Sequence, residues 1–80
     1  MTKPFYMDLG DFEEDKRVDA IGHQAMVHKK VVEFITDSDA GKAERYISKL
    51  TDRFPGIRII ARGDGPVKDT VWVKVGPPEN

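Results

Sequence analysis

The stretch from Val31 to Val75 limits the fold most strongly, because it alternates between strand and helix patterns. Residues 31–36 are rich in β-branched and aromatic side chains, which favours a strand. Residues 39–54 carry apolar side chains at helical spacing and end at a Pro-Gly pair, which indicates a helix. Residues 57–62 and 70–75 flank a turn rich in glycine and predict a hairpin. We therefore expect a strand–helix–strand unit with parallel strands, followed by a returning antiparallel strand.

The segment before this unit predicts one more helix and a leader. Residues 11–27 begin with acids and carry a stripe of apolar side chains, which is typical of an amphipathic helix. Gly22 inside this helix costs up to ~1 kcal/mol relative to alanine, and a close approach to another backbone would explain it. Residues 1–10 predict an edge strand, with a frayed leader as the alternative. The prolines in residues 76–80 predict a flexible tail.

Length and composition bound the class of protein. Eighty residues predict one domain over residues 1–80. We expect an α+β (α/β-like) fold in the order (β)αβαββ, with two helices and a mixed sheet of three or four strands. The chain has no cysteine, which excludes disulfides and thiolate chemistry and fits a cytoplasmic protein. The net charge of −1 creates no global basic field, and no apolar run is long enough to cross a membrane.

Alternation along the strands predicts two chemically different faces of the sheet. The last strand places three valines on one face and Trp72 on the other. The preceding strand has Ile57, Ile59 and Ala61 as its apolar set, so we expect them beneath the helices. Glu33 favours an outward position and so directs Phe34 into the core. The residues predicted to form a binding surface on the other face are Arg58, Ile60, Arg62, Trp72 and Lys74.

The second predicted helix carries a row of basic side chains on one flank. These residues, which recur at i, i+3, i+7 and i+11, are Lys42, Arg45, Lys49 and Arg53. Such a row is most often a solvated helix face. It can also follow a phosphate backbone or meet an acidic partner.

Three interpretations of the Trp72 face are open. The first helix can cover it, which makes Trp72 a core residue. The face can contact a protein partner or form a homodimer, since tryptophan and arginine are common interface anchors. It can also stack and hold single-stranded nucleic acid such as RNA, together with the basic flank of the second helix. We predict a small non-catalytic binding or regulatory module for protein–protein contact or self-association, with nucleic-acid binding as the alternative.

No catalytic, cofactor or metal motif supports an enzyme. Gly41-Lys42 resembles the end of a phosphate loop but lacks the spaced glycine and the hydroxyl residue. Asp37 and Asp39 could hold Mg²⁺, although capping of the second helix is the preferred role for the acids and Ser38. The histidines and serines lack the spacing of a zinc site or an activated nucleophile.

The predicted order βαβαββ resembles that of three families: the C-terminal domain of bacterial translation initiation factor three, the Alba chromatin proteins and the small sulfur-relay proteins. The resemblance lies in element order over most of the chain. The sulfur-relay family uses a Cys-Pro pair at its first helix, and the absence of cysteine excludes that activity. The other two families bind nucleic acid, which is what the resemblance implies for the alternative function.

Overall fold

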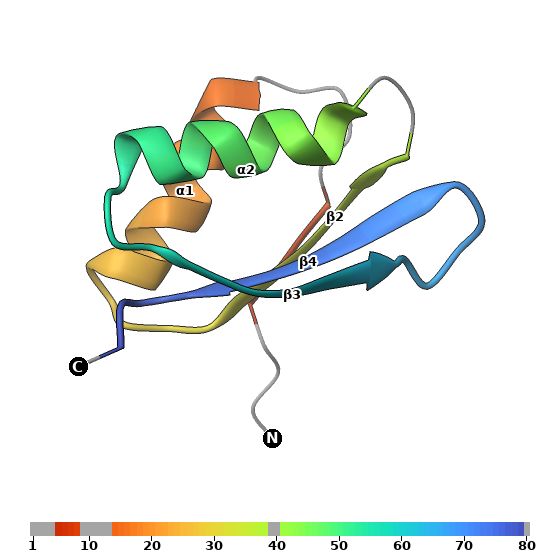
Figure 1. The fold of residues 1–80 in the computed structure, drawn as a ribbon. Helices are drawn as coiled ribbons and strands as arrows, with labels where there is room; N and C mark the ends of the chain where they lie inside the picture. The colour runs from red at the N-terminus through yellow and green to blue at the C-terminus, as the bar shows by residue number, and fades with distance from the viewer. Residues whose placement is uncertain (1–4, 9–13, 39–40, 80) are drawn as a thin grey trace.

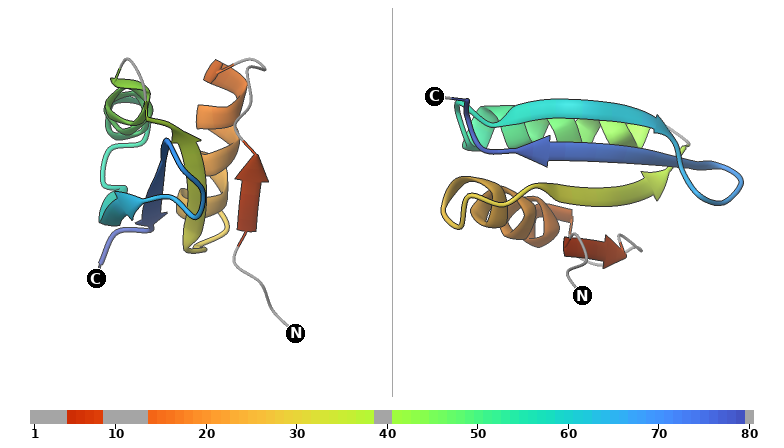
Figure 2. Two further views of the ribbon diagram at one scale, coloured as in Figure 1. Left: turned by 90° about the vertical axis from the view of Figure 1, so that its right-hand side faces the viewer. Right: turned by 90° about the horizontal axis from the view of Figure 1, so that it is seen from below.

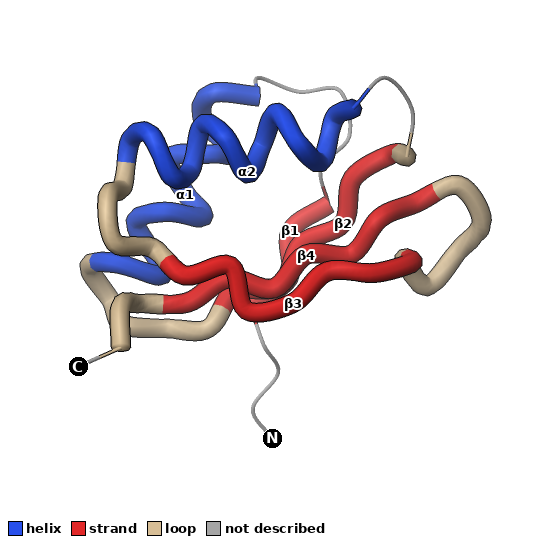
Figure 3. Tube along the Cα trace, viewed as in Figure 1, coloured by secondary structure: helices blue, strands red, loops and turns tan. Residues whose placement is uncertain are grey.

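A computed structural model describes residues 5–8, 14–38 and 41–79, and places two helices on one side of a sheet (Figure 1). The elements are β1 (Phe5–Asp8), α1 (Glu14–Met26), β2 (Val32–Asp37), α2 (Lys42–Arg53), β3 (Arg58–Asp64) and β4 (Thr70–Gly76). Figure 3 shows the same separation, with both helices above the strands. The structure thus confirms a domain of the α+β class with two helices.

The sheet is built around β4. This strand pairs antiparallel with β2 on one side and with β3 on the other, so β2 and β3 run in the same direction. The backbone of β1 pairs parallel with β2, which gives the order β1-β2-β4-β3 (Figure 2). The predicted antiparallel hairpin is confirmed as β3 and β4.

The core lies between the helices and one face of the sheet. Strand β2 contributes Val32, Phe34 and Thr36, which are buried in strict alternation with less buried neighbours. Strand β4 contributes Val73 and Val75, which face the same way because each is the cross-strand partner of a buried β2 residue. The buried hydrophobic residues of the helices and of the segment before β3 are Val18, Ile21, Ala25, Ala43, Tyr46, Leu50 and Ile57.

Gly22 lies where the two helices meet. A β-carbon at this position would overlap the ring of Phe54, which follows α2. The close neighbour of Gly22 is therefore an aromatic side chain and not the backbone expected from the sequence. The glycine makes room for a ring that packs against the core cluster.

The predicted starts of both helices, at Asp11 and Asp39, fall outside the described residues. Helix α1 begins at Glu14 in the described chain, and residues 11–13 of its predicted start lie outside the described residues. Helix α2 begins at Lys42, and its N-cap is Gly41 with φ +65° and no side-chain cap. Capping by Asp37 or Ser38 is therefore wrong, while the predicted cap Asp39 lies outside the described residues. A glycine suits this position because its backbone adopts positive φ without strain.

A β-bulge in β3 changes which side chains face the helices. Ile59 pairs with Val75 and Ala61 pairs with the next residue, Lys74, so Ile60 is the extra residue. A bulge of this kind shifts the alternation of every residue that follows it. Arg62 then lies opposite buried Val73 and on the helix side of the sheet. The placement of Arg62 on the Trp72 face, and of Ala61 in the core set, is wrong for this reason.

Candidate binding face

The side of the sheet away from the helices carries the candidate site. The right-hand view of Figure 2 shows the strands from this side. We call this surface the open face and define it as this side of strands β2, β4 and β3. Its central side chains are Glu33 and Ile35 of β2, Trp72 and Lys74 of β4, and Ile60 and Ala61 of β3, and Arg58 lies at its end opposite Gly76. The helices pack against the opposite set, so α1 does not cover Trp72.

Trp72 is the central side chain of the open face. It pairs with Ile35 across the β2–β4 ladder and is partly buried. Its indole Nε1 donates a 2.8 Å hydrogen bond to Oε1 of Glu33. Gly63 lies beside the ring, because a β-carbon there would sit 3.9 Å from Cε3 of Trp72. One hydrogen bond therefore fixes the indole on the sheet surface, and Gly63 leaves room for the ring because it has no side chain.

One end of the open face, where β4 finishes, is apolar. Gly76 ends β4, and a β-carbon on it would lie 2.9 Å from Cδ1 of Ile60 and 3.6 Å from Cγ2 of Val31. Val31 is 42% exposed although it is a large hydrophobic residue. Arg58 borders this region and donates from Nε to the carbonyl oxygen of Pro77 over 3.0 Å. The open face thus combines aliphatic groups, an indole and a few charges.

Charges on the open face are mixed in sign. Glu33 and Lys74 are direct cross-strand partners, so one anion and one cation lie side by side at its centre. Arg62, which would have added a third cation, instead forms a 2.8 Å ion pair with Glu44 of α2. The contact lowers the pKa of the Glu44 carboxyl, chiefly through the hydrogen bond from Arg62.

The basic flank of α2 meets acidic residues of α1. Arg45 and Lys49 lie 3.1 and 2.8 Å from the Glu14 carboxylate. Lys49 and Arg53 contact Asp15 at 2.9 and 3.0 Å. Residue numbers rise together along both helices, so the helices run in the same direction and share a ladder of ion pairs. The further pairs are Arg53 with Asp19 at 3.2 Å and Lys42 with Asp37 at 3.6 Å.

Glu14 is the most strongly perturbed acid of this ladder. Hydrogen bonds from Arg45 and then from Lys49 lower its pKa from 4.5 to about 2. The pKa of Lys49 is raised in turn, mainly by its hydrogen bonds to Glu14 and Asp15. The ion pairs engage the basic flank with acids of the same chain, while Arg45 and Arg53 stay exposed to solvent as predicted for a solvated helix face.

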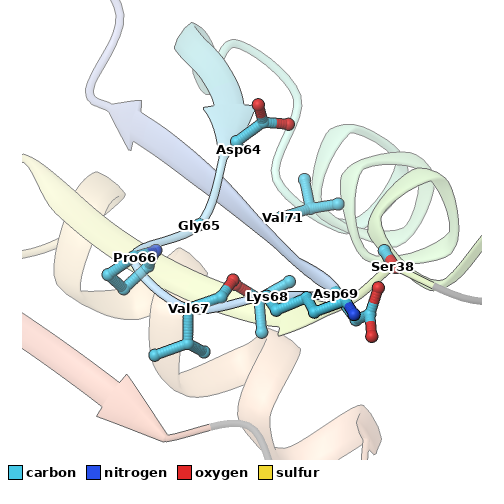
Figure 4. Close-up of a pocket in the computed structure, with 9 residues that line it drawn as sticks. Ser38, Asp64, Gly65, Pro66, Val67, Lys68, Asp69 and Val71 are labelled. Carbon is cyan, nitrogen blue, oxygen red and sulfur yellow. The ribbon is translucent and has the colours of Figure 1, made fainter.

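A hollow lies at the tip of the β3–β4 hairpin (Figure 4). It has a volume of about 550 Å³ and is lined by Ser38 together with the hairpin residues 64–71. Asp64 and Asp69 lie at opposite ends of this hollow in Figure 4. Throughout the part of the chain that the structure describes, His, Cys, Asp and Glu form no group of three that could hold a metal ion.

Comparisons with protein-family models, curated proteins and solved structures give no match. The likeness in element order to the three families named above therefore stays at the level of order alone. Among the described residues, neither helix has the length and hydrophobicity needed to cross a bilayer.

Sequence reasoning missed two features of this site. The bond between Trp72 and Glu33 is not among the sequence predictions, although alternation assigns both residues to the same outward face. The ion-pair ladder was also missed, although its signal was present. Asp15 and Asp19 are four residues apart, as are successive bases at 45, 49 and 53, which places each set on one helix flank.

Proposed function

We propose that this protein is a small, non-catalytic binding module of the cytoplasm that contacts another protein surface through its open face. The observation that carries the proposal is the indole of Trp72, held on a sheet face that neither helix covers. Tryptophan anchors interfaces well because it buries a large apolar area while its N–H keeps a polar partner. The proposal takes β1 as the fourth strand of the sheet, at the edge beside β2.

Charge favours a protein over a nucleic acid as the partner. A nucleic-acid site gains its affinity from cations that neutralise phosphates. Of the seven cations assigned to the alternative, five contact acids of this chain. These five are Lys42, Arg45, Lys49, Arg53 and Arg62. The remaining two are Arg58 and Lys74, and Lys74 lies beside Glu33. A face with both signs of charge suits a protein surface better than a polyanion.

Site-specific photocrosslinking in the expressing cell tests the proposal. We would replace Ile35, on the open face, with p-benzoylphenylalanine. The matched control carries the same group at Ser48, an exposed position on α2. The proposal predicts protein adducts from position 35 that position 48 does not give. Equal adducts from both positions, or none from position 35, would refute binding through this face.

A further inference from the structure

We propose that the partner of the open face is a second copy of this chain, packed face to face about a two-fold axis that runs along the strands between β2 and β4. This inference rests on the proposed function and names its partner. It is carried by the pairing register of β2 and β4, which sets out complementary groups in rows across the face.

The register defines these rows. Glu33 lies opposite Lys74, and Ile35 lies opposite Trp72 in the next row. A two-fold axis along the strands, midway between β2 and β4, exchanges the two positions of each row. Each Lys74 then lies over Glu33 of the other copy, and each Trp72 lies over Ile35 of the other copy. The two central rows therefore become an ion-pair row and an apolar row, and neither copy has to change its pairing register.

One of the two outer rows fits the same operation. Asp37 and Thr70 form the other row, and both are engaged within their own chain: Asp37 pairs with Lys42 at 3.6 Å, and the Thr70 hydroxyl donates to the carbonyl oxygen of Val67 over 2.6 Å. At the opposite end the next same-face positions are Val31 and Gly76. Exposed Val31 would then lie over the glycine of the other copy, beside the aliphatic group of Ile60. Across the other three rows a large group meets a smaller one or one of opposite charge, which is what a self-complementary interface requires.

Other orientations of the two copies lose this match. A two-fold axis perpendicular to the strands and midway between the central rows places Glu33 over Ile35. A carboxylate would then be buried against an aliphatic side chain, which is costly without a partner of opposite charge. An axis through the Glu33 row brings like charges together. Charge complementarity thus selects the axis that runs along the strands.

The size of the face limits the affinity. Three strands spaced about 4.8 Å apart and about 20 Å long present a patch of roughly 300 Å². Stable interfaces bury about 800 Å² on each partner. Even with β1 added, the patch places this dimer in the weak, transient class, with a dissociation constant of roughly 0.1–1 mM.

A charge-swap experiment tests the proposed dimer. Sedimentation equilibrium would be measured from about 10 μM to about 1 mM for the whole chain and its variants. Glu33→Lys places two ammonium groups together, one from the substituted position and one from Lys74 of the other copy, while Lys74→Glu places two carboxylates together. We expect each variant alone to associate roughly tenfold more weakly or worse. The equimolar mixture should associate again, because each cation of one variant then meets a glutamate of the other.

Two further variants separate charge from other effects. The double variant Glu33→Lys/Lys74→Glu should self-associate again, although it lacks the bond from Trp72 to Glu33. Lys68→Glu changes charge in the exposed hairpin loop and should leave association unchanged. Thermal unfolding of each variant would show that it is folded.

The outcomes distinguish this inference from the proposed function. A wild-type chain that stays monomeric over the whole range, or a mixture that fails to associate, would overturn the second-copy proposal. If photocrosslinks from position 35 then join a different protein, the open face still binds and only its partner is wrong. A crosslinked product of twice the 9.0 kDa chain mass agrees with the dimer.

Discussion

Gly22 lies against the ring of Phe54, and this ring decides whether Gly22→Ala raises or lowers the free energy of unfolding. In an open helical site, glycine to alanine gains about 1 kcal/mol of stability. At position 22 the new methyl group would overlap the Phe54 ring, which must move. Forced rearrangement of packed side chains costs about 1–3 kcal/mol. We therefore expect Gly22→Ala to lower the free energy of unfolding by about 1 kcal/mol on balance.

Truncation of the ring should reverse this effect. Phe54→Ala alone should cost about 2 kcal/mol, below the value for a fully buried ring because Phe54 is only partly buried. In the Phe54→Ala background the overlap is gone, so Gly22→Ala should then stabilise by about 1 kcal/mol. The coupling energy of the double-mutant cycle is thus about 2 kcal/mol.

Urea unfolding followed by the fluorescence of Trp72 measures all four members of the cycle. Ser48 is an exposed position of α2, so Ser48→Gly and Ser48→Ala give the glycine-to-alanine difference at an open helical site. A stabilising Gly22→Ala in the wild-type background would contradict the packing argument. A coupling energy near zero would do the same.

Two more predictions concern groups between the helices. Glu14 has its pKa lowered from 4.5 to about 2, so its contribution to stability is present above pH 4.5 and is lost as pH falls toward 2. We expect a loss of about 1 kcal/mol over that range after allowance for solvent screening, and Glu14→Gln should remove most of this dependence in urea unfolding at the two pH values. An equal pH dependence in the variant would show that other acids are responsible. Tyr46 is fully buried, and its hydroxyl has no hydrogen-bond partner in the described structure. Tyr46→Phe should therefore raise the free energy of unfolding by about 1 kcal/mol, and a fall would contradict an unsatisfied hydroxyl.

Much of the fold follows from side-chain periodicity. The sequence assigns Phe34 and Val73 to the core because alternation in a strand needs only the sequence and one buried face. It assigns Val18 and Ile21 to the buried stripe of the first helix for the corresponding reason. The outward position of Glu33 and Trp72 also follows from alternation, so the centre of the open face could be predicted.

The wrong placements in β3 arose because a β-bulge shifts the alternation of the residues that follow it. The bulge at Ile60 inserts one residue without a clear sequence signal, so Arg62 lies on the helix side and pairs with Glu44. The prediction for the basic flank of α2 used one helix alone, although the environment of that flank depends on α1. Contacts between elements that are distant in sequence cannot be read from either pattern separately. The sequence could therefore place the strands of the site more reliably than its charges.

The most direct test of binding through the open face is the photocrosslink from position 35 measured in a Trp72→Ala background. Thermal unfolding would first establish that this variant is folded. The account predicts that the adducts seen with Trp72 present are lost or strongly reduced, because the indole is the anchor of the interface. Adducts of unchanged yield in the folded Trp72→Ala variant would contradict the account.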